Sequence, residues 1–153
     1  MTIRFSTGLR GEIAGSNGFK GAMDTGGSIA IYSGTQPADA DSAETGTLLC
    51  TCTVSSLAVG AGGDLTWTVD EASPPVVSVG KGAAVWSGVN AATGTAGWFR
   101  ARGVATTGAS TTAERFDGSV GTSGADLNLG SVSLVSGRTT TVDSCDVTFP
   151  ANA

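Results

Sequence analysis

Short segments in which apolar and polar positions alternate dominate the chain from residue 28 onward. The two-residue period is clearest at residues 29–32, 47–54 and 65–69. Further short apolar segments follow at residues 76–79, 83–89, 98–104, 114–120, 125–129, 132–135 and 139–149. About eight to ten such segments, separated by turn residues, are typical of strands in an antiparallel all-β fold. The pattern therefore predicts an all-β protein, either an antiparallel β-sandwich or a barrel.

Three local patterns make this prediction more specific. Along residues 47–54 the alternation places one set of side chains on a single strand face: Leu48, Cys50, Cys52 and Val54. The opposite face would then carry Leu49, Thr51 and Thr53. The pair Asp117–Gly118 is typical of a two-residue hairpin turn. Residues 90–97 are rich in Ala, Thr and Gly and predict a second turn.

The first 27 residues follow a different pattern. Ser6 is a favoured helix N-cap, and Leu9 and Ile13 lie four residues apart, on one face of a short helix. We therefore divide the chain into a partly helical N-terminal segment, residues 1–27, and a single β domain, residues 28–153. The segment can either dock as an arm on a neighbouring subunit or cover one end of the chain's own core. The sequence leaves both arrangements open.

Composition narrows the range of possible chemistry. The 153 residues include 24 glycines and no histidine, and 14% of them are charged. The absence of histidine removes His-based triads, His general bases and His metal ligands. Three tryptophans, Trp67, Trp86 and Trp98, lie in strand patterns, where core packing explains them better than a sugar-binding cleft. We expect no catalytic residue and no enzymatic activity, and we expect no bound cofactor.

The distribution of charge argues against nucleic acid and membrane partners. The formal net charge is −5, and the eight Lys and Arg residues are scattered rather than clustered. The closest pair, Arg100 and Arg102, lies on one side of a predicted strand. It forms either an anion contact or, more simply, a solvated strand face. The chain contains no apolar run long enough to span a membrane and no apolar region of a secretory signal near residue 1.

Two clusters of potential ligands do not form a recognisable metal site. Cys50, Cys52 and Cys145 offer three thiols without the usual zinc-site spacing, so buried free thiols are the simplest interpretation, with a disulfide or zinc as alternatives. Asp39, Asp41 and Glu44 lie in a polar loop that lacks the ligand and glycine positions of an EF-hand. We interpret that loop as a solvated acidic surface and expect no metal.

Several segments, taken in order, resemble small structural proteins of tailed-bacteriophage virions. These are residues 1–10 (MTIRFSTGLR), 29–49 (IAIYSGTQPADADSAETGTLL), 85–88 (VWSG), 94–100 (GTAGWFR) and 117–128 (DGSVGTSGADLN). The resemblance covers most of the chain and weakens around residues 73–75 and 79–82. It implies a protein of the virion, assembled in the cytoplasm of the bacterial host.

The resemblance implies a capsid cement or decoration protein, built as an antiparallel, jelly-roll-like β-sandwich, that stabilises the head by bridging shell subunits. Its expected partners are the major capsid protein and copies of itself in a homo-oligomer. Arg4, Phe5 and Leu9 are the candidate subunit-contact residues. An alternative is a tail, neck or fibre component that binds other virion proteins or the host surface. A third, an enzyme that acts on surface polysaccharide, rests only on the presence of acidic residues and tryptophans.

Overall fold

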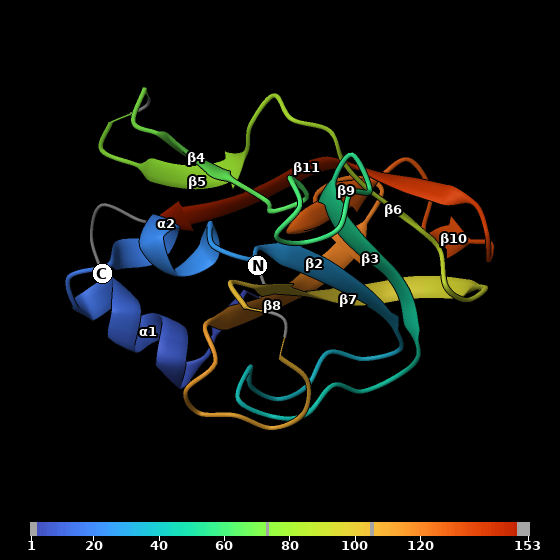
Figure 1. The fold of residues 1–153 in the computed structure, drawn as a ribbon, viewed down its shortest axis with the longest axis horizontal. Coiled ribbons are helices and arrows are strands. Elements are labelled where there is room, and N and C mark those ends of the chain that lie inside the picture. The colour runs from blue at the N-terminus through green and yellow to red at the C-terminus, as the bar shows by residue number, and fades with distance from the viewer. Residues whose placement is uncertain (1–2, 73, 105, 150–153) are drawn as a thin grey trace.

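Strands form most of the regular structure in this chain (Figure 1). The computed structural model describes residues 3–72, 74–104 and 106–149. Its helices are α1 (Thr7–Ala14) and α2 (Gly18–Met23). Its strands are β1 (Arg4–Phe5), β2 (Ser28–Ser33), β3 (Leu48–Val54), β4 (Trp67–Asp70), β5 (Val77–Lys81), β6 (Trp86–Val89), β7 (Gly94–Arg102), β8 (Arg115–Gly121), β9 (Leu127–Leu129), β10 (Ser133–Leu134) and β11 (Thr139–Phe149). The prediction of an all-β protein with a partly helical N-terminal segment is confirmed.

Seven strands close into a barrel, in the order β8, β7, β2, β3, β6, β11, β9 and back to β8. All neighbours in this circuit pair antiparallel except β9 and β8, which pair parallel. The strand pattern left a sandwich or a barrel open, and the expected jelly-roll-like sandwich is corrected here, because the hydrogen bonding runs continuously around a barrel. Closure depends on β9, a strand of only three residues that pairs with both β11 and β8.

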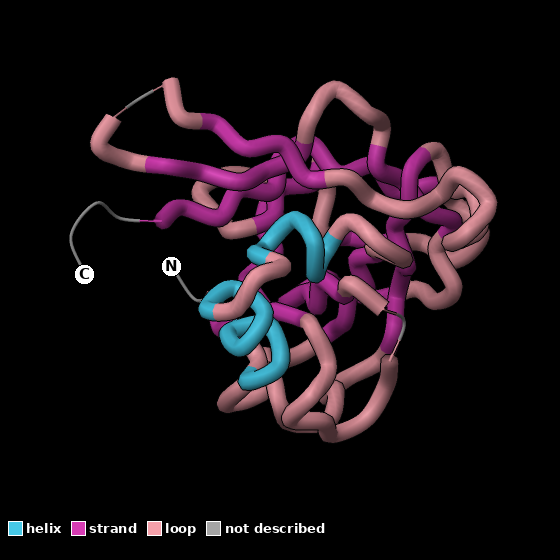
Figure 2. Tube along the Cα trace, turned by 60° about the vertical axis from the view of Figure 1, so that its left-hand side comes forward, coloured by secondary structure: helices cyan, strands magenta, loops and turns pink. Residues whose placement is uncertain are grey.

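A three-stranded extension projects from the barrel. β4 pairs with β5, and β5 pairs with the last four residues of β11. Figures 1 and 2 show these strands reaching away from the rest of the molecule. β11 is eleven residues long, and its successive parts pair with β6, β9 and β5. One strand thus belongs to both the barrel and the extension.

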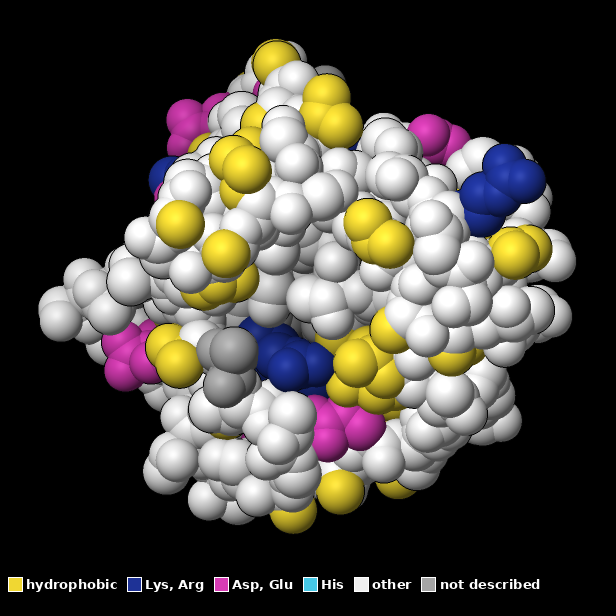
Figure 3. All heavy atoms as spheres, turned by 45° about the vertical axis from the view of Figure 1, so that its right-hand side comes forward, with side chains coloured by type: hydrophobic (Ala, Val, Ile, Leu, Met, Phe, Trp, Pro, Cys, Tyr) yellow, Lys and Arg dark blue, Asp and Glu magenta, His cyan; other side chains and the backbone are white. Residues whose placement is uncertain are grey.

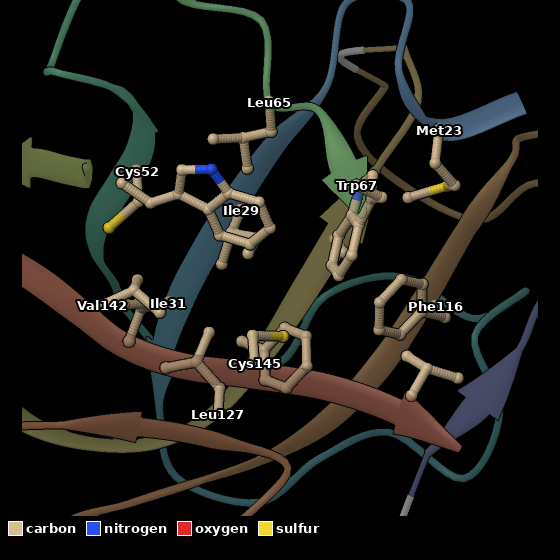
Figure 4. Packing of buried hydrophobic residues seen from close by; sticks show 14 of the residues in the cluster. Met23, Ile29, Ile31, Cys52, Leu65, Trp67, Phe116, Leu127, Val142 and Cys145 are labelled. Atoms are coloured by element: carbon tan, nitrogen blue, oxygen red, sulfur yellow. The ribbon is translucent and has the colours of Figure 1, made fainter. Parts of the chain in front are cut away.

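Large aromatic side chains fill the core, as Figure 4 shows in part. Trp67 and Trp86 meet edge to face with their ring centroids 4.9 Å apart, and both are almost fully buried. Trp98 is also buried, but it packs in a separate small cluster with Tyr32. The prediction of core packing is confirmed for Trp67 and Trp86, whereas Trp98 is buried outside the main core. Burial of such side chains is a dominant source of stability, because truncating one to alanine typically costs about 3–5 kcal/mol.

The three cysteines are buried free thiols. The Sγ atoms of Cys50 and Cys52 lie 3.8 Å apart on one face of β3, and Cys145 belongs to the same core. Burial raises the pKa of the Cys145 thiol well above its ordinary value, which favours the neutral form. The cysteines therefore pack as small apolar side chains, as the simplest interpretation of the sequence predicted.

The N-terminal segment packs against the chain's own core. The Ser6 hydroxyl accepts a hydrogen bond from the Leu9 amide at 3.1 Å, which confirms the predicted N-cap. Leu9, Phe19 and Met23 are buried in the main hydrophobic cluster. β1 also pairs with β8. Of the two arrangements left open by the sequence, this conformation is the one in which the segment covers its own core.

The predicted faces of β3 are wrong at its first residues. Leu48 is exposed and Leu49 is fully buried, the reverse of the simple alternation. The register between β2 and β3 shifts here, because Ile31 pairs with Cys50 while Tyr32 pairs with Leu48. Leu49 is the extra residue of this bulge, and it turns into the core. The later residues Cys50 and Cys52 keep the predicted common face.

Both predicted turns are also corrected. Asp117 and Gly118 lie in the middle of β8 rather than at a hairpin tip. A Cβ atom at Gly118 would lie 2.6 Å from Cε1 of Phe99, so glycine is required here for close packing rather than for a turn. The predicted turn at residues 90–97 is too long, because β7 already begins at Gly94.

Two glycines of α1 are expected to respond in opposite ways to substitution by alanine. Gly11 has open space around it, so Gly11→Ala should raise the free energy of unfolding by about 0.5–1 kcal/mol through better helix propensity. At Gly8 an added methyl would overlap the backbone carbonyl of Thr112, so Gly8→Ala should lower it by about 1–3 kcal/mol. Denaturant unfolding followed by tryptophan fluorescence measures both. A neutral or stabilising Gly8→Ala would show that α1 is not tightly docked.

Candidate functional site: a buried arginine cluster

The predicted subunit-contact residues do not form one exposed surface. Leu9 is fully buried, and Phe5 is half-buried. The Phe5 ring packs against the rings of Phe19, Phe116 and Phe149. Arg4 has an exposed side chain, and its Nη1 donates to the carbonyl oxygen of Pro37. A contact through Arg4 stays a prediction, and in this conformation Leu9 has no surface to offer to a partner.

The most unusual group of side chains lies on the outer face of β7 and β8. Phe99, Ala101 and Phe116 point into the barrel, so their neighbours along the strands point outward. These outward residues are Arg100, Arg102, Arg115 and Asp117, and all four are buried. The loops 34–47 and 103–114 lie together beside β2, β7 and β8 (Figure 1). We call these four residues together with Glu44 the arginine cluster.

Arg100 is at the centre of the cluster and has carboxylates on two sides. Its Nε and Nη2 donate to Oδ1 and Oδ2 of Asp117 at 2.6 and 2.7 Å, a bidentate pair with no exposure of either side chain. Its Nη1 lies 3.1 Å from Oε1 of Glu44 and donates to the carbonyl oxygen of Ser42 at 3.0 Å. Strand β8 and loop 34–47 are thus joined through one guanidinium.

Arg115 holds both loops through backbone carbonyl groups. Its Nε donates to the carbonyl oxygen of Ala40 at 2.6 Å, and its Nη2 donates to that of Asp41 at 3.0 Å. Its Nη1 donates to the carbonyl oxygen of Gly108 at 2.9 Å, in the other loop. The amide of Gly108 in turn donates to Oε2 of Glu44 at 2.8 Å. The two loops are therefore fixed to each other as well as to the barrel.

Aromatic side chains border the cluster. Tyr32 and Trp98 stack with centroids 4.6 Å apart and an angle of 14° between their planes. The Trp98 indole donates to the carbonyl oxygen of Thr45 at 3.2 Å, and the Arg100 guanidinium lies 5.5 Å from its ring centroid. Such a contact adds a cation–π attraction. Arg102 reaches the same group, because its Nη2 donates to the Tyr32 hydroxyl at 2.9 Å.

Burial and pairing shift the acid–base properties of the cluster. Burial raises the pKa of Tyr32, so its hydroxyl stays protonated at neutral pH. Burial also raises the pKa of Asp117, against the opposing effect of Arg100. For Glu44, burial raises the pKa, but the Gly108 amide and the Arg100 guanidinium together outweigh it and hold the pKa below its ordinary value.

The sequence interpretation missed this cluster in two ways. Arg100 and Arg102 were interpreted as a solvated strand face, but both are buried beneath the loops. The loop that carries Glu44 was interpreted as a solvated acidic surface, yet Glu44 pairs with Arg100. One sequence signal could have indicated the pairing. Loop 34–47 has acidic residues without basic residues nearby in the sequence, and β7 carries arginines that can pair with them. The distance of more than 50 residues between them concealed the pairing.

A second feature is an open cleft of about 420 Å³ lined by residues of β9, β10, β11 and the turns that join them. Hydroxyl groups are common in its lining, which includes Ser131, Ser133, Thr139 and Thr141. Arg138 and Asp143 add one charge of each sign, and both are exposed. Neither described helix is long and apolar enough to cross a membrane. The described residues contain no group of three or more Cys, Asp or Glu side chains placed to hold a metal ion.

Comparisons with known proteins return no match for this chain. No family model matches it, and neither a curated protein nor a solved structure is similar to it.

Removing the carboxylate from the central ion pair should destabilise the protein strongly. Asp117→Asn leaves the buried Arg100 charge with only Glu44 as a partner, and we expect the free energy of unfolding to fall by about 3 kcal/mol or more. Asp143→Asn is the matched control at an exposed site, where a change within about 0.5 kcal/mol is expected. Equal effects of the two substitutions in denaturant unfolding would contradict a structural role for the pair.

The contribution of Glu44 should depend on pH. Because its folded-state pKa is lowered, the stability it supplies is fully present above the ordinary glutamate pKa of about 4.3 and is lost as the pH falls through the lower folded-state value. Glu44→Gln should therefore be less stable than the unmodified protein at neutral pH, and the difference should shrink in acid. Unfolding curves over a pH series measure this, with Glu71→Gln as the exposed control. A difference that stays constant with pH would rule out the titration.

Proposed function

We propose that this protein is a capsid cement or decoration protein of a tailed bacteriophage, which stabilises the head by bridging shell subunits. In this proposal it acts in the virion, its partners are the major capsid protein and copies of itself, and it works without catalysis. The bridging role requires a rigid body with surfaces that fit other proteins.

The location of the phage-like segments in the fold is the observation that carries the proposal. Residues 29–49 form β2, loop 34–47 and the start of β3. The other segments from residue 85 onward cover most of β6, β7, β8 and β9. Together these elements are a large part of the barrel wall and the loop over the arginine cluster. The segments that resemble phage proteins thus belong to the framework of the fold. This location supports an architecture shared with those proteins and a structural role.

The outer surface suits contacts with other proteins. Nine large apolar side chains of the described residues are substantially exposed: Leu48, Leu57, Val59, Val69, Val76, Val85, Val89, Val104 and Val135. Three of the eight basic residues are withdrawn into the arginine cluster. Depletion of charge around exposed apolar side chains is typical of the centres of protein–protein interfaces. Val89 is the most exposed of these residues and lies on the outer face of the barrel wall.

A two-layer packing like that of a jelly roll is part of this proposal. Opposite walls of the barrel press their apolar side chains together, and β9 alone joins β11 to β8. Without that three-residue link the strands would form one open sheet, curved so that its two halves face each other. A sandwich packs its core between two facing layers in a similar way.

The number and position of copies in the particle test the proposal. Quantitative mass spectrometry of purified particles should give copy numbers comparable to that of the major capsid protein, and antibody labelling should cover the head. Heads stripped of the protein should release DNA at a lower temperature, and adding it back should restore the higher one. A few copies at one vertex or along the tail would instead support the alternative, a tail, neck or fibre component, and would overturn the cement role.

A further inference from the structure

We propose that Arg102 and Tyr32 form a carboxylate-binding site on the outer face of the barrel. The site would take a single carboxylate group, either from a small organic acid or from the C-terminus or an acidic side chain of another protein. It uses Arg102, the arginine of the cluster that has no carboxylate partner among the described residues. The proposal does not depend on the role of the protein in a virion.

Arg102 differs from the other two arginines of the cluster in its partners. Arg100 is satisfied by two carboxylates, and Arg115 is satisfied by backbone carbonyl groups of both loops. Arg102 is 93% buried, and the hydroxyl of Tyr32 is its hydrogen-bond acceptor among the described residues. No carboxylate of the described residues lies within 4.0 Å of it. A guanidinium so deeply buried without an anion is rare, because an unpaired buried charge is costly.

One edge of the Arg102 guanidinium keeps a free donor. Its Nε is buried and has no hydrogen-bond partner. Its Nη1 also has no acceptor among the described residues, but it lies on the other side of the guanidinium from the Nε–H bond. The Nε and Nη2 edge is the one with which Arg100 binds both oxygens of Asp117. At Arg102 the Nη2 of this edge donates to Tyr32, so a carboxylate would accept from Nε and from the Tyr32 hydroxyl.

Tyr32 supplies a further donor. Its hydroxyl oxygen accepts the bond from Arg102, so its own proton has no acceptor among the described residues. Burial raises the pKa of this hydroxyl, which keeps the proton in place at neutral pH. The stack on Trp98 fixes the ring, so the hydroxyl is held in position before any ligand arrives. The side chains of Arg102 and Tyr32, on neighbouring strands, thus direct hydrogen-bond donors toward the same point.

The charge of the cluster favours a monoanion. The carboxylates of Glu44 and Asp117 pair with Arg100, and the charges of Glu44 and Asp41 act on Arg115, whereas Arg102 has no described carboxylate within 4.0 Å. One carboxylate would neutralise the charge of Arg102, whereas a phosphate dianion would leave a new buried negative charge beside Glu44 and Asp117. Figure 3 shows basic side-chain atoms at the base of a hollow on one face of the molecule, with hydrophobic and acidic side chains beside them. The burial of Arg102 restricts its contact with water, and an ion pair is stronger where water is restricted.

The arginine Nε–H signals in proton–nitrogen correlation spectra provide the test. The Arg102 signal is assigned by its loss in Arg102→Lys, and the full-length protein is then titrated at neutral pH and constant ionic strength. The probes are sodium acetate, sodium phosphate, sodium chloride and N-acetylglycine, which carries the carboxylate of a chain terminus. Tyr32→Phe removes the hydroxyl but keeps the ring stacked on Trp98. Arg138→Lys is the matched control at an exposed arginine.

The proposal predicts a saturable shift of the Arg102 signal with acetate or N-acetylglycine, weakened at least about tenfold in Tyr32→Phe and unchanged in Arg138→Lys. Tighter binding of N-acetylglycine would identify a protein C-terminus as the source, and tighter binding of acetate would identify a small acid. The same shift with chloride or phosphate would overturn the assignment to carboxylates. A linear, unsaturated response to every probe would overturn the site itself.

Discussion

The bidentate pair between Arg100 and Asp117 is the interaction on which the outer half of the molecule depends. A guanidinium on the outside of a barrel would ordinarily remain in water, but here it is fully buried. Its burial requires a cover, and the cover must itself supply acceptors because the interior cannot leave the charge unpaired. Loop 34–47 supplies Glu44 and the Ser42 carbonyl, and loop 103–114 is held to it through Arg115. Long loops that would otherwise be mobile therefore become a fixed layer.

Close packing of small residues makes this layer possible. Gly97 on β7 lies so near the backbone of Gly34 that any side chain there would overlap its carbonyl group, so the loop can approach the strand only over glycine. Gly118 likewise makes room for the Phe99 ring on the inner side of β8. The high glycine content thus serves contact between layers as well as turns. The same arrangement buries three arginines beneath the loops. It therefore lowers the number of charges on the surface and creates ion pairs in the interior.

The sequence predicted what local patterns determine and missed what distant pairing determines. Alternation with a period of two identified the strands, and the Ser6 cap and the buried tryptophans followed from local chemistry. Barrel closure could not be predicted in this way, because it depends on three residues of β9 that pair with two distant strands. The bulge at Leu49 depends on register with β2, which no single strand reveals. The arginine cluster was missed because alternation separates two faces of a strand without showing that a loop covers the outer one.

β11 belongs to two parts of the molecule, the barrel and the extension. Its last four residues pair with β5, and these pairs are separate from those with β6 and β9 that close the barrel. Tension applied along the C-terminal end of β11 would load the extension before the barrel. The extension is nonetheless not an independent flap, because Trp67 of β4, Val79 of β5 and Val147 of β11 are buried in the main core. A local opening that separated it would pull Trp67 away from Trp86 and expose the core, so the hydrophobic contacts join the opening of the extension to that of the barrel.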